Sequence, residues 1–145
     1  MRTRAPRAGE LLALAGAVCV IVAMFLPWYQ GATGRLDAWE TFGPAVVLLL
    51  LAAGAGLWLF ASTVTERSTA LPVAVGVWTV VLGVIGLVSA IVRLLERPDH
   101  STQLCAGPWL ALVGTLAVLV GAWLSLKDER VSTYEAASPT PRPRP

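Results

Sequence analysis

The side chains best suited to chemistry gather in the polar stretch between residues 96 and 105. This stretch holds Glu96, Asp99, Cys105 and His100, which is the only histidine of the chain. Carboxylate, imidazole and thiolate groups are common zinc ligands, and zinc needs three or four of them in a fixed geometry. A short loop offers neither regular ligand spacing nor a second shell of groups that would orient the ligands. We therefore expect no metal, no cofactor and no catalytic residue here.

Chemistry could also lie inside the four long apolar stretches that dominate the rest of the chain. Transporters and proton pumps place ionisable side chains in such stretches, facing the interior of a helix bundle. None of the four contains one, apart from Glu10 at the start of the first. The polar side chains at depth carry hydroxyls that can bond the carbonyl one turn earlier, namely Thr79, Ser89, Thr115 and Ser125. We therefore predict a protein that is not an enzyme, an ion-coupled transporter or a proton-conducting subunit.

The lengths of the apolar stretches define the fold class. Each has about 18 to 22 residues, and at about 1.5 Å per residue each can cross a hydrocarbon core of roughly 30 Å. Charged residues make up 14% of the chain, well below the roughly 25% of ordinary globular proteins. We predict an all-α membrane protein with four transmembrane helices in a compact bundle, over residues 10–27, 44–61, 71–92 and 108–126.

The distribution of lysine and arginine predicts the orientation in the membrane. With a cytoplasmic N-terminus, eight of the eleven basic residues lie inside, leaving Arg35, Arg93 and Arg97 outside, as the positive-inside rule requires. We expect a multi-pass protein of a bacterial cytoplasmic membrane, with both termini in the cytoplasm. Residues 1–9 are then a basic N-terminal segment and residues 127–145 a disordered tail. The basic start resembles a secretory signal, but no small-residue cleavage site follows it, so we expect no cleavage.

Small residues recur every seven positions in three of the predicted helices. In lipid, close approach of helix backbones supplies much of the contact energy, and small residues permit that approach. A seven-residue period keeps such a stripe facing one neighbour in a left-handed crossing. We predict that the stripes pack helices together, with a pore or a lipid groove as the alternative. The predicted packing residues are Gly9, Gly16 and Ala23, then Gly76, Gly83 and Ala90, and finally Gly107, Gly114 and Gly121.

Aromatic residues mark the predicted outer surface. Tryptophan and tyrosine prefer the boundary between lipid and water, and we place Trp28, Tyr29, Trp39, Phe42 and Trp109 at the outer interface. Apolar residues three apart at positions 36, 39 and 42 predict a short amphipathic helix lying on that surface. This segment is either an interfacial anchor or a docking site for a partner or a lipid headgroup.

Three sequence segments carry a family resemblance. They are residues 26–29 (Leu-Pro-Trp-Tyr), residues 38–42 (Ala-Trp-Glu-Thr-Phe) and residues 121–129, which begin Gly-Ala-Trp-Leu. In combination the chain resembles a group of small, functionally uncharacterised four-helix membrane proteins of high-GC Gram-positive bacteria. The resemblance spans residues 9–129 and implies the four-helix topology. It implies no activity.

These observations lead to one functional prediction and two alternatives. We predict a non-enzymatic accessory or self-associating helix bundle, whose partners are the lipid bilayer and either itself or another membrane protein, with no nucleic acid. One alternative is a small oligomeric channel or carrier, which would move an uncharged or apolar compound through a cavity lined by glycines, Thr79 and Thr115. The other is an envelope sensor whose outer loop binds a ligand.

Overall fold

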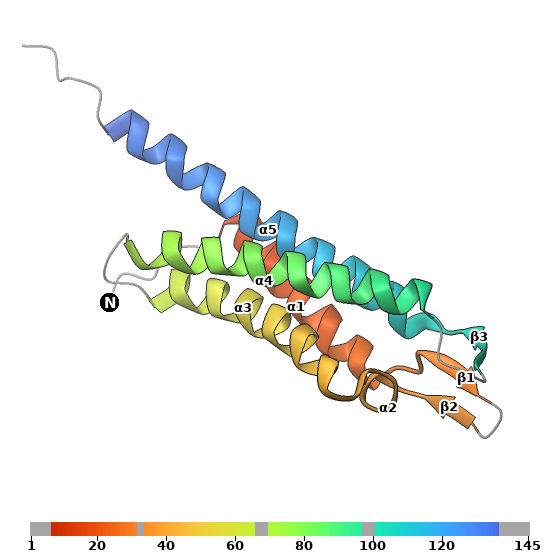
Figure 1. Cartoon of the computed structure of the whole chain (residues 1–145). Helices are drawn as coiled ribbons and strands as arrows, with labels where there is room; N and C mark the ends of the chain where they lie inside the picture. Colours follow the sequence, from red (N-terminus) through yellow and green to blue (C-terminus); the bar gives the residue numbers. More distant parts are fainter. Residues whose placement is uncertain (1–6, 32–33, 66–69, 97–100, 137–145) are drawn as a thin grey trace, which may run out of the picture.

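The computed structural model of the chain describes residues 7–31, 34–65, 70–96 and 101–136. Four long helices dominate it, namely α1 (Ala8–Phe25), α3 (Val46–Thr65), α4 (Ala70–Leu95) and α5 (Ala106–Ala136). All four are long and apolar enough to cross a membrane, as the sequence predicts for an all-α membrane protein. The shorter elements lie at one end of the long helices (Figure 1), and they are β1 (Tyr29–Gly31), β2 (Gly34–Leu36), α2 (Ala38–Phe42), the 3₁₀ turn η1 (Gly43–Ala45) and β3 (Ser101–Leu104).

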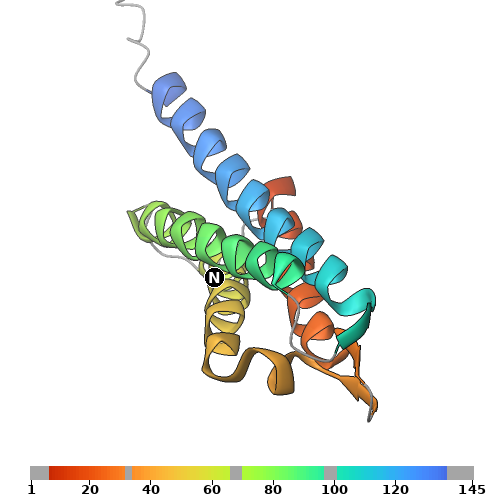
Figure 2. The same ribbon diagram turned by 45° about the vertical axis from the view of Figure 1, so that its right-hand side comes forward.

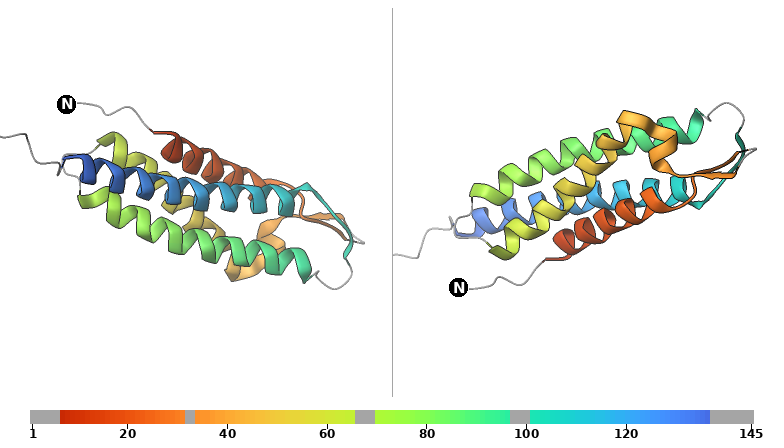
Figure 3. Two further views of the ribbon diagram at one scale, coloured as in Figure 1. Left: turned by 90° about the horizontal axis from the view of Figure 1, so that it is seen from above. Right: turned by 90° about the horizontal axis from the view of Figure 1, so that it is seen from below.

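The long helices contact one another in the cyclic order α1, α3, α4 and α5. The most extensive contact joins α1 to α5, the first and last elements of the chain. The beginning of α1 and the end of α5 lie at the end of the molecule away from the strands (Figure 3). The core between the helices is built from small and branched side chains such as Ala17, Val20, Leu49 and Val118.

Proline and glycine set the boundaries of the elements near the sheet. Helix α1 stops at Phe25 because Leu26 precedes Pro27, and a residue before proline is forced into an extended conformation. Helix α2 begins at Asp37, whose carboxylate accepts a hydrogen bond of 3.0 Å from the Glu40 amide. It ends at Gly43, which has a positive φ of 53° that favours glycine. The short helix predicted over residues 36–42 is therefore present over Ala38–Phe42, whereas Leu36 belongs to β2.

The sheet was not foreseen from the sequence. Its strand order is β2-β1-β3, and both pairings are antiparallel. Tyr29 of β1 lies opposite Leu36 of β2 and Leu104 of β3. The pairing with β3 joins segments about seventy residues apart, so the sheet brings the loop after α1 against the loop before α5.

Helix α5 differs most from its predicted span. The sequence predicts an end at Leu126 followed by a disordered tail, whereas α5 continues to Ala136 and projects beyond the other helices (Figure 2). Residues 127–136 contain neither glycine nor proline and include the strong helix formers Lys, Arg, Glu and Ala. Extending an existing helix needs no new nucleus, so the chain stays helical past its apolar part. Residues 137–145 of the predicted tail lie outside the described residues.

Candidate functional site

The three-stranded sheet presents two different faces. Tyr29 in β1 is fully buried, and the residues opposite it are half-buried leucines. The next residue, Gln30, pairs with Arg35 of β2 and with Gln103 of β3, and all three side chains are exposed. Side chains alternate between the two faces of a strand. The sheet therefore carries a polar row of Gln30, Arg35 and Gln103 on the face opposite to Tyr29.

Backbone hydrogen bonds tie this sheet to the helices on either side. The Trp28 amide donates to the carbonyl oxygen of Leu36 at 2.7 Å, and the Trp28 carbonyl accepts from the Cys105 amide at 2.9 Å. The Gly107 amide in the first turn of α5 donates to the carbonyl oxygen of Pro27 at 3.0 Å. These bonds hold the end of α1 and the beginning of α5 against the same short stretch of chain.

Trp28 fills the space between α1 and α5 at this end. Its indole N–H donates a 2.7 Å hydrogen bond to the carbonyl oxygen of Ala23 in the last turn of α1. Its ring lies against Gly107, so closely that a methyl group added at that glycine would overlap the indole. A glycine at position 107 is therefore required by the buried tryptophan.

Tyr29 makes the corresponding bond to a different helix. Its hydroxyl donates to the carbonyl oxygen of Arg93 in α4. Arg93 is the third residue from the end of α4, and Ala23 is the third residue from the end of α1. Two adjacent aromatic side chains thus donate to carbonyl oxygens in the last turns of two helices, and these bonds tie the sheet to the ends of α1 and α4.

The nine predicted packing residues are all buried, and many of them contact each other. A methyl group added at Gly9 would lie 2.8 Å from the carbonyl oxygen of Gly121, and one at Gly16 would lie 2.6 Å from that of Gly114. On α4, Gly76 and Gly83 face leucine side chains of α5 instead. The small residues of α1 and α5 therefore allow backbone-to-backbone contact, while those of α4 accommodate larger side chains.

Four of the five predicted outer-interface residues divide into two groups. Trp39 is 42% exposed and Trp109 is 53% exposed, as an interfacial position requires. Trp28 and Tyr29 are instead fully buried, so the prediction that they face the interface is corrected. They are buried because the strand pairing folds them over the helix ends, where their polar groups find carbonyl acceptors. Phe42 is the last residue of α2.

Three of the four polar side chains at depth make the local bonds that we expected. Thr79, Ser89 and Thr115 each donate to the carbonyl oxygen four residues earlier, at 2.8 to 2.9 Å. Thr79 also reaches the carbonyl oxygen of Ala55 in α3 at 3.2 Å. These hydroxyls are therefore bonded to backbone carbonyls, and that of Thr79 also links α4 to α3.

Sequence reasoning did not foresee the burial of Glu10. It is 6% exposed, although it lies at the beginning of α1. Its carboxylate accepts a 2.9 Å hydrogen bond from the amide of Arg7, which begins the helix. A glutamate three residues after the N-cap of a helix often makes this bond. The spacing of Arg7 and Glu10 could therefore have predicted the hydrogen bond from the sequence.

The described residues contain no group of three or more His, Cys, Asp or Glu side chains that could hold a metal ion. Asp99 and His100, which the sequence analysis considered as candidate metal ligands, lie outside the described part of the chain. Cys19 and Cys105 are both free thiols. The chain matches no protein-family model, no curated protein and no solved structure.

Proposed function

We propose that this protein is a non-enzymatic, accessory component of a bacterial cytoplasmic membrane, which binds another membrane or envelope component through its outer sheet. In this proposal the four helices form a compact bundle with both termini in the cytoplasm, and the sheet lies on the outer side. The observation that carries the proposal is the polar row of Gln30, Arg35 and Gln103 on a sheet that is bonded to three helices. Binding sites are most precise on such rigid supports.

The glycine stripes of α1 and α5 already pack against each other, which favours the outer sheet over the helices as the surface that binds a partner. Gly9, Gly16, Gly114 and Gly121 are occupied by the contact between α1 and α5. They are therefore not available to pack against another copy or another protein. Among the predicted contact features, the outer surface with the exposed Trp39 and Trp109 is left for a partner, and the structure adds the exposed side chains of Arg35 and Gln103.

The chemistry of the polar row indicates the kind of partner. Arg35 can bind a carboxylate through two parallel hydrogen bonds, and the flanking amides of Gln30 and Gln103 can both donate and accept. We expect a partner that presents a carboxylate flanked by carbonyl groups, as acidic peptide segments do. An exposed charge of this kind contributes more to the rate and specificity of association than to affinity.

The carrier alternative finds only part of the lining that it requires. It calls for a cavity lined by glycines with Thr79 and Thr115. Thr79 and Gly54 line an apolar groove, whereas Thr115 is fully buried and bonded to two carbonyls of its own helix. The sensor alternative is favoured by one observation. The chain segment 27–29 bonds the ends of α1 and α4 and the beginning of α5, so a ligand on the polar row would act on three helices at once.

Affinity purification of the tagged full-length chain from native membranes, in mild detergent and with mass spectrometry, tests the proposal. We expect one stoichiometric partner that is lost when Arg35→Glu reverses the charge of the polar row. Lys127→Glu is the matched control, because it makes the same charge change at an exposed position at the other end of the molecule. A chain that is recovered alone and runs as a sharp monomer on blue-native gels would contradict the proposal. Equal partner loss in both variants would contradict the role of the row.

A further inference from the structure

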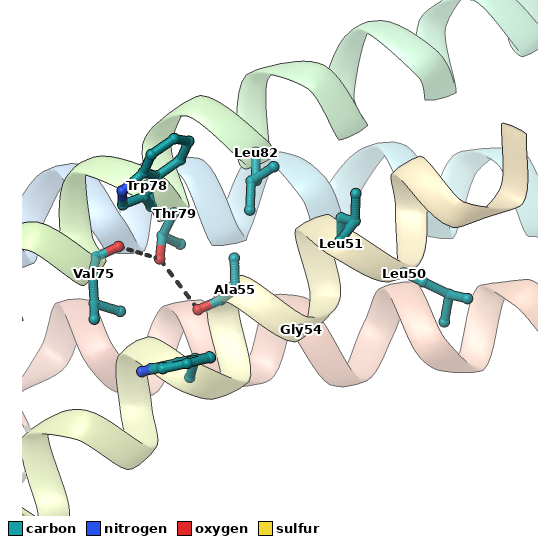
Figure 4. Close-up of a pocket in the computed structure, with 9 residues that line it drawn as sticks. Leu50, Leu51, Gly54, Ala55, Val75, Trp78, Thr79 and Leu82 are labelled. Atoms are coloured by element: carbon teal, nitrogen blue, oxygen red, sulfur yellow. Dashed lines mark hydrogen bonds between the residues drawn. The ribbon is translucent and has the colours of Figure 1, made fainter.

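An apolar groove of about 420 Å³ lies between α3 and α4. Figure 4 shows that Leu51 and Gly54 line it from α3, while Trp78 and Leu82 line it from α4. Both helix segments lie within the candidate membrane spans, Val46–Thr65 and Ala74–Leu95. With these spans in a bilayer, the medium around the groove is hydrocarbon, and a void that no atom fills there loses dispersion contacts with its walls.

Gly54 lines the groove and takes no part in close packing between the helices. A methyl group added at Gly54 would meet no atom within 4 Å. The other helical glycines of the described residues all have neighbours within that distance, and they are Gly9, Gly16, Gly56, Gly76, Gly83, Gly86, Gly107, Gly114 and Gly121. A glycine in a helix interior costs about 1 kcal/mol relative to alanine. Contacts within the chain do not explain this glycine, and its effect on the structure is to deepen the groove.

The lining of the groove is almost wholly apolar, so an occupant needs no polar group to bind there. Its one polar side chain, Thr79, donates its hydroxyl to Val75 and Ala55 carbonyls, and the bonds are drawn in Figure 4. The other lining side chains are leucine, valine, alanine and tryptophan. Trp58 and Trp78 at the rim are each 66% exposed. The occupant must therefore be apolar along its whole length in the groove.

The size of the groove distinguishes a narrow chain from a helix. From Leu50 to Trp58 it follows α3 for nine residues, a rise of about 12 Å, which is about two fifths of a hydrocarbon core of roughly 30 Å. A methylene group is about the size of a water molecule, which takes roughly 30 Å³ in the liquid, so the groove holds about a dozen methylenes. A helix rises about 5.4 Å per turn, so only about two turns of a partner helix would lie along the groove. The groove has nine lining residues, whereas a stable protein interface uses roughly 20 to 30 on each side.

We propose that this groove binds one acyl chain of a membrane phospholipid, which it holds as a specific ligand. The chain would lie along Gly54 between α3 and α4, with Trp58 and Trp78 on either side. This inference concerns a different surface from the outer sheet and does not depend on the partner proposed for it.

Native mass spectrometry of the full-length protein, purified in mild detergent and then offered dioleoyl phosphatidylglycerol, tests the proposal. We expect the wild-type chain to retain one phospholipid, and Gly54→Leu to lose it because the new side chain fills the groove. Ala61→Leu is the matched control, because Ala61 is an exposed small residue seven positions further along α3 and outside the groove. Circular dichroism establishes that both variants keep their helix content, as the open space around Gly54 predicts.

Three results would overturn the proposal. The first is a wild-type chain that retains no phospholipid, which needs no variant to interpret. The second is equal retention by Gly54→Leu and Ala61→Leu. The third is a dimer mass that Gly54→Leu abolishes while the lipid mass stays, since the groove would then be a contact between two copies. None of these results bears on the partner of the polar row, which Arg35→Glu tests separately.

Discussion

Gly16 of α1 and Gly114 of α5 lie so close together that each occupies the space where a side chain of the other would be. A methyl group added at Gly16 would lie 2.6 Å from the carbonyl oxygen of Gly114, and one added at Gly114 would lie 2.9 Å from that of Gly16. Seven residues along each helix, Gly9 and Gly121 repeat the same reciprocal contact. The first and last transmembrane helices are thus joined backbone to backbone, and the chain closes on itself.

This relationship predicts a graded response to alanine. Gly16→Ala places a methyl group against backbone atoms that cannot move aside, so we expect a loss of about 1 to 3 kcal/mol in the free energy of unfolding. Gly83→Ala brings a methyl group only to 3.5 Å from Leu119, an ordinary contact, and should change little. Gly54→Ala should be neutral or stabilising, since its methyl group meets nothing within 4 Å. Unfolding by sodium dodecyl sulfate in mixed micelles, followed by circular dichroism, measures the series.

The order of the three variants matters more than any single value. If Gly16→Ala and Gly54→Ala lose the same free energy, then glycine acts through helix propensity alone and the close contact of α1 with α5 contributes nothing. Gly54→Ala as the most destabilised variant would contradict the packing described here.

A second prediction concerns Trp28 and Gly107. Trp28→Phe removes the hydrogen bond to Ala23 but keeps an aromatic ring, so we expect a loss of about 0.5 to 1.5 kcal/mol. Gly107→Ala introduces the methyl group that overlaps the indole. Because the two residues touch, Trp28→Leu should relieve part of the damage that Gly107→Ala causes, and a double-mutant cycle measures this coupling. Strictly additive losses would contradict direct contact.

The four long helices were predictable because their signal is local. Each apolar stretch is long enough to span a bilayer, and hydrocarbon leaves the backbone no other partner than its own helix. The short helix at residues 38–42 was predictable in part for a similar reason, from the spacing of positions 36, 39 and 42, although Leu36 itself lies in β2. The seven-residue stripes identified buried faces, but they did not tell which stripe meets which. Nothing in the sequence pairs Gly9 with Gly121 in preference to Gly76.

The sheet and the burial of Trp28 were out of reach for a physical reason. The strands have only three or four residues, and two glycines and two glutamines are among them, so they carry neither clear hydrophobic alternation nor high strand propensity. Their pairing joins residues 29–31 to residues 101–104, and it is set by the position of the helices that carry them. A tryptophan after a membrane span normally indicates a position at the lipid–water interface. Trp28 is buried instead because Gly107 leaves room for its ring against the beginning of α5, and this contact appears only in the folded structure.

A third prediction isolates the bond between the sheet and α4. Tyr29→Phe keeps the buried ring but leaves the Arg93 carbonyl without its hydroxyl donor. We expect the last turn of α4 to open more often, so that amides of residues 92–96 exchange with deuterium several-fold faster. The stability of α1 should be almost unchanged, because its last turn is held by Trp28. Hydrogen exchange with mass spectrometry measures both regions, and exchange that rises equally in α1 and α4 would contradict a separate role for Tyr29.

A fourth prediction tests the proposed orientation. In a chain without its native cysteines (Cys19→Ala, Cys105→Ala), Gln103→Cys places a thiol in β3 and Lys127→Cys places one on α5, both at exposed positions. If the sheet lies outside the cell, a membrane-impermeant maleimide labels position 103 in intact spheroplasts. Position 127 is then labelled only after the membrane is opened. The reverse pattern would place the sheet and its polar row in the cytoplasm and would exclude an extracytoplasmic partner.

The last prediction concerns the continuation of α5 beyond the bundle. An isolated helix of ten residues is marginal in water, but residues 127–136 extend a helix that is already nucleated within the bundle. Their helicity should therefore depend on the continuity of α5. Ser132→Pro removes a backbone donor and obstructs the preceding turn, so Cα chemical shifts of residues 128–136 should move toward coil values. Ser132→Ala, which keeps the donor and favours helix, should leave those shifts helical. If the shifts of the unaltered chain are already those of a coil, α5 ends where its apolar residues end, and the predicted boundary at Leu126 is restored.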